Sequence, residues 1–233
     1  MTRRNIPQII YQPWFPSFLK NCVHEFLTWF VIQINAAKPF MPIIERGLKY
    51  SSDDSIINIE QDTGAGISTL RPFLSPSTSI SNIRIEQLDA EKIKLNGLFV
   101  SINSFHQLTR DQATTLLTKV AKSNRPIAIL EGNNDSLWQV VGMLFFVPLT
   151  IILTTPLVKP FRLSRIIFTY LIPILPLVTL IDGFIALFKL YSPQDLTELT
   201  DNIRIVDYTW ESGKLDNGRG GKIIYLLGIP QNR

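Results

Sequence analysis

The stretch Ser55-Ile-Ile-Asn-Ile-Glu-Gln-Asp62-Thr-Gly64-Ala-Gly66-Ile-Ser68 decides the fold that the sequence predicts. Its first half is a short run of β-branched residues with polar neighbours, which is typical of a buried parallel strand. Gly64 and Gly66 then let the backbone turn sharply and leave room for a ligand against bare main chain. Residues 69–71 are expected to open a helix whose N-terminal amides point toward that ligand. The stretch therefore predicts the first strand and the ligand-binding turn of an open α/β sheet.

Downstream of this stretch, strand-like and helix-like segments alternate. Residues 83–90 and 96–106 have the apolar pattern of strands, and residues 125–131 form a further apolar strand that ends in an acid. Between the last two strands, residues 109–122 place their apolar side chains at helical spacing. A strand, a helix and a strand in this order form a βαβ unit, so we expect parallel pairing with a right-handed crossover.

The C-terminal part of the chain predicts a helix followed by an antiparallel hairpin. Ser192, Pro193 and Asp195 are typical of a helix start, as N-cap, first helical residue and acid of the first turn. Residues 205–213 and 222–230 are predicted strands on either side of a glycine-rich loop. The predicted fold class is thus α/β, with a Rossmann-like, mostly parallel sheet that ends in an antiparallel hairpin.

The N-terminal part, residues 1–50, is rich in aromatic and apolar residues. Residues 17–33 predict a helix with Ser17 as its N-cap, and residues 39–49 predict a second helix. The first helix has apolar side chains on much of its circumference, so it needs cover from protein or from lipid. We expect these helices either to form a cap over the ligand or simply to pack on the sheet.

Two apolar runs form the second organising feature of the chain. Residues 136–158 contain no charged side chain, and residues 166–181 form a second uncharged run. The first run is long enough to cross a bilayer, which takes roughly 20 apolar residues. The loop between the runs is basic and contains Lys159, Arg162 and Arg165.

These runs predict an inserted apolar helical hairpin, over residues 135–190, that associates with a membrane on its cytoplasmic face. A spanning hairpin would place the basic loop opposite a cytoplasmic sheet, against the tendency of basic loops to stay inside. Several prolines interrupt the runs, and Asp182 is costly in hydrocarbon. We therefore expect the hairpin to lie in or along one leaflet, with Lys159, Arg162 and Arg165 at anionic headgroups. A spanning hairpin and a buried helical layer are the alternatives.

Composition excludes several classes of function. The formal net charge of +4 is too small to indicate general affinity for nucleic acid. The single Cys22 rules out an intramolecular disulfide and a four-cysteine metal site, and it fits a reducing compartment. His24 and His106 lie too far apart in sequence to form a histidine pair at metal-ligand spacing. We expect neither a metal nor a nucleic-acid partner.

The pattern Asp62-x-Gly64-x-Gly66-x-Ser68 resembles motif I of the class I S-adenosylmethionine-dependent methyltransferases. A lone Gly-x-Gly is a weak signal, and the position of the acid strengthens it. The resemblance implies that S-adenosylmethionine is the cofactor, that Asp62 helps to hold its methionine part, and that Gly64 and Gly66 pack under it. Ser68 stands where a third glycine is often found in this family.

Four further segments are similar to a bacterial group of membrane-associated methyltransferase-like proteins. They are Phe105-His106, the loop Lys-Pro-Phe-Arg-Leu-Ser-Arg at 159–165, and residues 169–173 and 208–213. Together with the strands and the terminal hairpin, the resemblance covers most of residues 50–230. It implies a class of reaction and no particular substrate.

The sequence departs from this family between Gly66 and the predicted strand at 83–90, where the chain is too short for a helix, a strand and another helix. The family's second strand ends in an acid that binds the ribose hydroxyls, and a carboxylate suits this role because it accepts two hydrogen bonds. Two alternatives follow. In the first, which we favour, the second strand is missing and Asp89 lies beside the adenine; in the other, the strand is the second and Glu86 binds the ribose.

Candidate catalytic residues follow the strand at 96–106. Asn103 and His106 lie at its carboxyl end, where ligands of open α/β sheets bind, and a histidine is suited to act as a general base. Glu131 ends the next strand and is expected either to orient an acceptor or to cap a helix. A histidine that simply packs beneath the N-terminal helices is the alternative role for His106.

The sequence as a whole predicts a cap over residues 1–50, a core over 51–134 and 191–233, and the inserted hairpin. The favoured function is a membrane-associated S-adenosylmethionine-dependent methyltransferase that acts on a small-molecule or lipid acceptor of apolar character. Methyl transfer is an in-line displacement, so the protein mainly aligns the reactants and excludes water. The alternatives are a non-catalytic, methyltransferase-like membrane protein and a small integral membrane protein with a coincidental glycine turn.

Overall fold

The computed structural model describes residues 3–4, 6–60, 67–84, 96–132, 136–218 and 220–231. It divides into two compact units. The hairpin unit comprises Met1–Asn35 and Asp135–Leu190, and the sheet unit comprises Ala36–Asn134 and Tyr191–Arg233. The boundary expected at residue 50 therefore falls at residue 35, because the second N-terminal helix packs on the sheet. The chain leaves the sheet unit once and returns to it after the hairpin.

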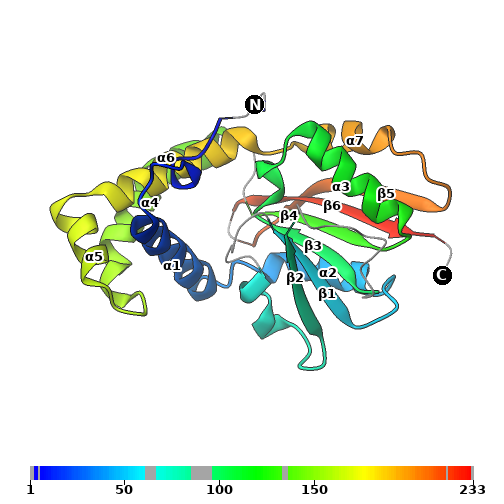
Figure 1. Ribbon diagram of the computed structural model, residues 1–233, viewed down its shortest axis with the longest axis horizontal. Coiled ribbons are helices and arrows are strands. Elements are labelled where there is room, and N and C mark those ends of the chain that lie inside the picture. Colours follow the sequence, from blue (N-terminus) through cyan, green and yellow to red (C-terminus); the bar gives the residue numbers. More distant parts are fainter. Residues whose placement is uncertain are drawn as a thin grey trace. The chain divides into compact units, whose positions relative to one another are not determined.

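The described residues of the sheet unit form a six-stranded sheet in the order β2-β1-β3-β4-β6-β5 (Figure 1). The strands are β1 Ser55–Glu60, β2 Ser79–Arg84, β3 Leu98–Ile102, β4 Ile127–Glu131, β5 Tyr208–Asp216 and β6 Lys222–Pro230. β2, β1, β3 and β4 pair in parallel, and β6 is antiparallel to both β4 and β5. Without β6, the order is that of a doubly wound sheet. The predicted Rossmann-like sheet with an antiparallel end is confirmed.

The strand β2 lies directly beside β1, with Ser55 opposite Ser79 and Glu60 opposite Arg84. It begins four residues before the expected strand and ends at Arg84, and residues 85–95 lie outside the described part of the chain. A place beside β1 is the second strand's place in the doubly wound order. The pairing thus fits the alternative in which this strand is the second.

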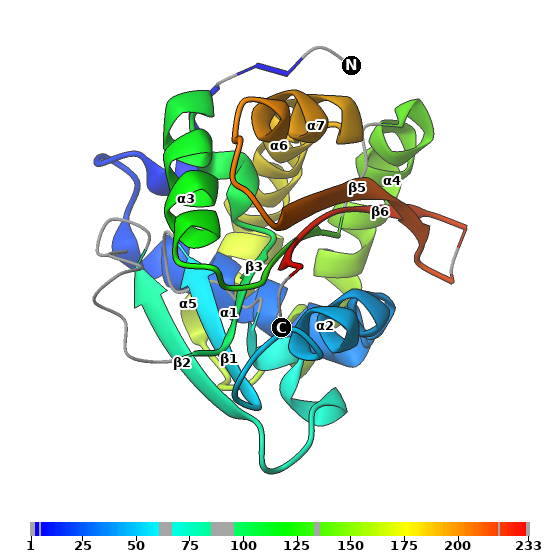
Figure 2. The same ribbon diagram turned by 90° about the vertical axis from the view of Figure 1, so that its right-hand side faces the viewer.

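Helices cover both faces of the sheet (Figure 2). α2 (Met41–Leu48) packs through Ile43 and Ile44 on alternate residues of the central strands. On the opposite face lie α3 (Arg110–Lys122) and α7 (Pro193–Asp201). Both of these helices begin with a capping box, and the predicted N-cap at Ser192 is confirmed. This arrangement explains why β3 and β4 are buried along their whole length.

An ion pair joins α2 to the antiparallel end of the sheet. Arg46 donates two hydrogen bonds to Glu211, at 3.0 and 2.6 Å, and the hydroxyl of Tyr225 donates a third at 2.7 Å. The hydrogen bonds from Arg46 and then from Tyr225 lower the pKa of Glu211 to about 2 from its ordinary 4.5. The folded state therefore favours the ionised carboxyl more than the unfolded state does.

This pair predicts a pH-dependent contribution to stability. A carboxyl whose pKa is lowered on folding stabilises the protein above its unfolded pKa, so the contribution is lost as the pH falls from about 4.5 toward 2. Because both side chains are nearly half exposed, we expect it to stay below about 1 kcal/mol. R46M should thus unfold more easily than the wild type at pH 6 in urea titrations. The difference should shrink at pH 3 and largely vanish only below about pH 2, and a difference that does not change with pH would contradict the assignment.

The hairpin unit is built around α1, Ser17–Gln33. α4 (Leu137–Thr154) continues into a 3-10 turn (Thr155–Leu157), and after a loop α5 (Leu163–Ile166) and a π-helical turn (Ile167–Leu171) lead to α6 (Ile174–Lys189). One side of α1 packs on α6 through Leu19 and Val23, and Phe26 packs on α4. The bounds of α1 agree with the prediction, but Pro16 and not Ser17 is its N-cap.

The prolines of the hairpin interrupt it less than expected. Pro148 lies inside α4, which continues through it. Pro156 and Pro173 lie at helix ends, where a missing backbone N–H costs little. The described chain has one helix, Leu137–Leu157, that is long and apolar enough to cross a membrane, and the segments on either side of Pro173 bend by 80°.

The chain before α1 runs along α6 as an N-terminal strap (residues 3–4 and 6–12). The carboxylate of Asp182 accepts the backbone N–H groups of Ile9 and Ile10 at 2.6 and 2.9 Å. Nearer the end of α6, Arg4 N–H donates to the carbonyl of Phe188 at 2.7 Å. These contacts explain how an acid is accommodated in an apolar helix, since a buried carboxylate needs donors.

Candidate functional site

The carboxyl ends of β1, β3 and β4 lie side by side at one edge of the parallel sheet. β1 pairs with β2 on one side and with β3 on the other, so the chain's connections diverge between β1 and β3. Open α/β sheets bind their ligands outside the carboxyl ends of the strands at such a switch point. The candidate site is therefore the loops that follow β1, β3 and β4.

The expected cofactor residues follow β1 and β2 in the sequence. Asp62, Gly64 and Gly66 come directly after β1, and Glu86 and Asp89 come after β2. All five lie outside the described residues, as does the side chain of Ser68. Their assignment rests on sequence and on the position of the strands that lead to them.

Asn103 is the first residue after β3 and adopts a left-handed backbone conformation with φ of 52°. Its amide oxygen accepts the backbone N–H of Gly132 at 2.6 Å, just beyond the end of β4. A Cβ at Gly132 would lie 3.1 Å from that oxygen, so glycine suits the close approach. Asn103 thus ties the loops of two neighbouring strands together while remaining exposed at the edge.

His106 and Glu131 form a buried pair across the same edge. The carboxylate of Glu131 accepts the backbone N–H of His106 through Oε1 at 3.0 Å, and its Oε2 lies 3.0 Å from the imidazole Nδ1. Both side chains are more than nine-tenths buried. A carboxylate in its ionised form offers only acceptors, so the tautomer that matches it has the proton on Nδ1 and the lone pair on Nε2.

The turn that presents His106 is fixed on several sides. Ser104 Oγ lies 2.9 Å from Ser101 Oγ and donates to the carbonyl of Ile59 in β1 at 3.4 Å. The ring of Phe105 packs against Tyr191, whose hydroxyl donates to the carbonyl of Leu108 at 2.9 Å. The imidazole is therefore held by a rigid support, which is what a positioned acid or base requires.

The three basic residues of the loop at 159–165, which were expected at headgroups, differ in their exposure. Lys159 is exposed. Arg165, only 1% exposed, pairs with Glu25 of α1 and donates to the carbonyls of Val158 and Pro160. Arg162 is half-exposed and also pairs with Glu25, at 2.6 to 2.9 Å. Arg165 thus holds the loop together, and of the three basic residues it is the least accessible to a headgroup.

The pairing of His106 with Glu131 was not predicted from sequence. The signal was present, since one residue ends a strand and the other follows the neighbouring strand. Their partnership depends on β3 and β4 being adjacent and parallel. Within the described residues, no group of three or more His, Cys, Asp or Glu side chains is placed to hold a metal ion.

No protein-family model matches the sequence, and no curated protein matches it. Two of the solved structures that are similar to it share 10% sequence identity with it. The first, PigF with SAH, has a TM-score of 0.42, and the alignment covers 94% of this chain and 62% of that one. The second, PKMT2 from Rickettsia typhi in complex with AdoHcy, has a TM-score of 0.35 and coverages of 96% and 55%. The chain thus spans under two thirds of either protein, and a likeness at this level assigns no function.

Proposed function

We propose that the protein is an S-adenosylmethionine-dependent methyltransferase whose cofactor binds at the carboxyl edge of β1 and β3. One observation carries this proposal: β1 is a central parallel strand at the switch point of the sheet, and it leads directly into Asp62-x-Gly64-x-Gly66.

Three acids in the loops and strand ends of this edge suit a cationic cofactor. The segments at 55–70, 98–109 and 127–132 contain the carboxylates of Glu60, Asp62 and Glu131 and no Lys or Arg. Arg84 ends β2 opposite Glu60, so the same edge also carries a cation. A sulfonium and an ammonium group would meet the opposite charge of the three acids. Residues of this kind fit S-adenosylmethionine, which supplies an electrophilic methyl group when bound. The place of β2 beside β1 makes Glu86 the better candidate for the ribose hydroxyls, ahead of Asp89.

The pair of His106 and Glu131 gives the site a base for the acceptor. An acceptor hydroxyl must lose its proton as the new O–CH3 bond forms. Nε2 of His106, which is buried in this structure, is suited to receive that proton once the acceptor reaches it. Asn103, exposed at the same edge, is suited to position the acceptor. The many exposed apolar side chains of the hairpin unit support membrane association and an apolar acceptor, such as a lipid or a quinone-like molecule.

Titration calorimetry with S-adenosylhomocysteine tests the cofactor site. We expect saturable binding and a raised melting temperature for the wild type, and binding at least tenfold weaker for D62A. The matched control is D53A, which removes an exposed acid just before the other end of β1 and should bind as the wild type does. Absence of both heat and thermal stabilisation in the wild type would overturn the proposal.

A non-catalytic relative is the second candidate. The described chain between Ile67 and Thr78 contains two single 3-10 turns where a parallel crossover usually contains an α-helix. A shortened crossover reduces the surface available to a cofactor. This candidate predicts that cofactor binding and methyl transfer are both absent while membrane association persists.

A further inference from the structure

The outward surface of α4 is apolar along its whole length. Only 11% of the apolar window in the segment Leu137–Leu157 is buried within the protein. Most of the exposed large side chains recur at three and four residues and form one stripe: Leu137, Trp138, Val141, Leu144, Phe145, Leu149, Ile152, Leu153 and Leu157. Phe146 is exposed as well. At a rise of about 1.5 Å per residue, this stripe is roughly 30 Å long. An apolar surface of this extent marks an interaction site.

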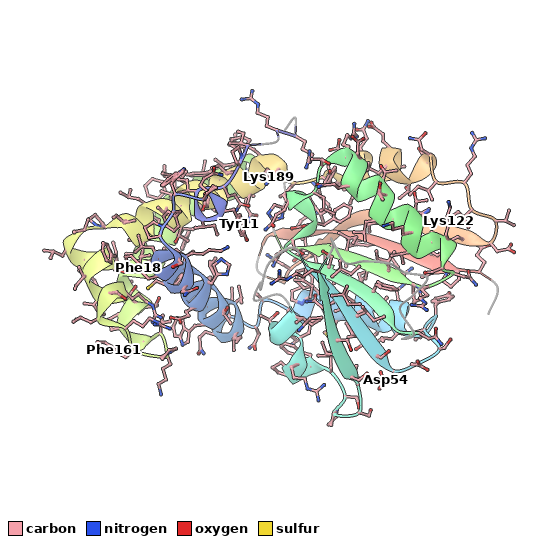
Figure 3. The ribbon with its side chains drawn as sticks, in the orientation of Figure 1. Tyr11, Phe18, Asp54, Lys122, Phe161 and Lys189 are labelled. Carbon is pink, nitrogen blue, oxygen red and sulfur yellow. The ribbon has the colours of Figure 1, made fainter. Side chains whose placement is uncertain are left out.

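The apolar surface continues into the loop that follows α4. Phe161 and Leu163 are both about two-thirds exposed, and Figure 3 shows Phe161 in the loop where the hairpin reverses. Lys159 and Arg162 lie in the same loop, and both are exposed. Apolar side chains bordered by cations are the composition of a segment that inserts among anionic headgroups.

The net charge of the protein belongs entirely to the hairpin unit. Its two segments contain seven Lys and Arg and three Asp and Glu, which gives +4, and this equals the formal net charge of the whole chain. The sheet unit is therefore neutral. Of the acids, Glu25 is bound by two arginines and Asp182 by backbone N–H groups. The net charge that this unit offers to a partner is positive.

The chain's connections argue against a spanning hairpin. Because the chain leaves the sheet unit before α4 and returns to it after α6, membrane crossings must come in pairs. α6 is unsuited to cross, since the N-terminal strap runs along it and brings Arg3, Arg4 and irregular backbone with it. Irregular backbone at membrane depth is not tolerated where it meets lipid. If α6 does not cross, α4 does not cross either.

We propose that the hairpin unit binds in the plane of one leaflet of an anionic membrane, with the α4 stripe and Phe161 among the acyl chains and Lys159 and Arg162 at the phosphates. This mode keeps both connections to the sheet unit on one side of the bilayer. It rests on the proposed membrane association and adds the lipid charge, the inserted face and the topology. A second copy of the chain is a poorer partner, because two units of charge +4 repel each other.

Vesicle sedimentation tests the lipid. The full chain should bind vesicles of phosphatidylcholine with 30% phosphatidylglycerol at least tenfold more tightly than vesicles of phosphatidylcholine alone, and salt should weaken the binding. Equal binding to both vesicles would overturn the electrostatic part. Absence of binding, or a stable dimer in light scattering that buries the stripe, would overturn the proposal. Cofactor affinity is measured separately in solution, so failure here leaves the methyltransferase assignment intact.

Matched variants test the inserted face. F145E adds a charge to a side chain that is 67% exposed, so the fold should tolerate it while vesicle affinity falls at least tenfold. V206E adds the same charge to an 86% exposed residue of the sheet unit and should bind normally. K159E should bind anionic vesicles about tenfold more weakly and should bind neutral vesicles as the wild type does. K122E, at the exposed Lys122 of α3, should keep the wild-type affinity for both.

Cysteine labelling tests the topology. The native Cys22 is buried, so a membrane-impermeant maleimide should label K159C and V206C above the wild-type background. On sealed inverted membrane vesicles we expect both to react without detergent and to a similar extent. If V206C reacted in sealed vesicles and K159C reacted only after detergent, the hairpin would cross the bilayer, and the in-plane mode would be overturned.

Discussion

E25Q is expected to lower the free energy of unfolding of the hairpin unit by roughly 3 kcal/mol, because it leaves the buried guanidinium of Arg165 without a counter-charge. Burial would raise the pKa of Glu25, but the hydrogen bonds and charges of Arg162 and Arg165 outweigh burial and hold that pKa below its usual value. The carboxylate is therefore ionised at neutral pH. A neutral amide keeps the shape of the side chain and removes its charge.

Hydrogen exchange is the suitable measurement, since the protein has two units and need not unfold in one step. Peptides from α1 and from residues 158–171 should exchange roughly a hundredfold faster in E25Q, while peptides from β3 and β4 stay unchanged. E45Q, at an exposed acid on α2, is the control and should shift no peptide by more than about 0.5 kcal/mol. Similar exchange rates in E25Q and E45Q would show that the pair of Glu25 and Arg165 does not stabilise the hairpin unit.

Two further variants separate burial of charge from loss of a contact. R162M should lower the free energy of unfolding by only about 1 kcal/mol, because Arg162 is half-exposed and the pair between Glu25 and Arg165 survives. The double variant E25L/R165M should be more stable than E25Q, since it removes the buried charge together with its partner and leaves only the half-exposed Arg162 without Glu25. If E25L/R165M were less stable than both E25Q and R162M, lost packing, and not a buried unpaired charge, would explain the instability of E25Q.

The elements predicted best are those whose signals are local. The bounds of α1, the cap of α7 and the strands β1 and β4 follow from periodicity, capping residues and β-branched runs that lie within a few residues of each other. β2 was displaced because it begins in Ser-Ile-Ser-Asn, which has the composition of a turn. Pairing with the neighbouring strand decides the structure there, since the side-chain amide of Asn58 in β1 donates to Oδ1 of Asn82 at 3.0 Å.

The missed contacts are those between residues far apart in the chain. Arg165 was expected at the headgroups, but a glutamate 140 residues earlier binds it inside the unit. Asp182 was expected to be costly in an apolar helix, but backbone N–H groups 172 and 173 residues away surround it. A charged residue in an apolar run therefore predicts that a partner exists, but the sequence does not show which residue the partner is. Glu131 and His106 are a third example, and here the missed partner changes the chemistry of the site.

E131Q is expected to lower methyl transfer by about 10² to 10⁴-fold if His106 is the base, while leaving cofactor affinity unchanged. The glutamine Oε1 must keep accepting the backbone N–H of His106, because its NH2 group would meet that N–H as donor against donor. The NH2 group then faces Nδ1 and donates to it. The proton of the neutral imidazole moves to Nε2, and the nitrogen that should receive the acceptor's proton is no longer basic.

The tautomer supplies a readout that a merely structural role would not move. The chain has two histidines, so the H24N background leaves a single imidazole to observe by ¹⁵N NMR. Nδ1 should be the protonated nitrogen with Glu131 and Nε2 with the glutamine. E198Q, at an exposed acid of α7, is the control for loss of a carboxylate in the same unit and should change neither the tautomer nor the rate.

Transfer of labelled methyl from S-adenosylmethionine to a lipid extract completes the test. H106N and E131Q should lose activity to a similar degree, and the double variant should lose little more, because residues that act as one unit are not additive. If E131Q changed the tautomer of His106 without lowering methyl transfer, the pair would only stabilise the turn at 105–107. Loss of transfer with no change of tautomer would show that Glu131 acts on the acceptor directly and not through the ring.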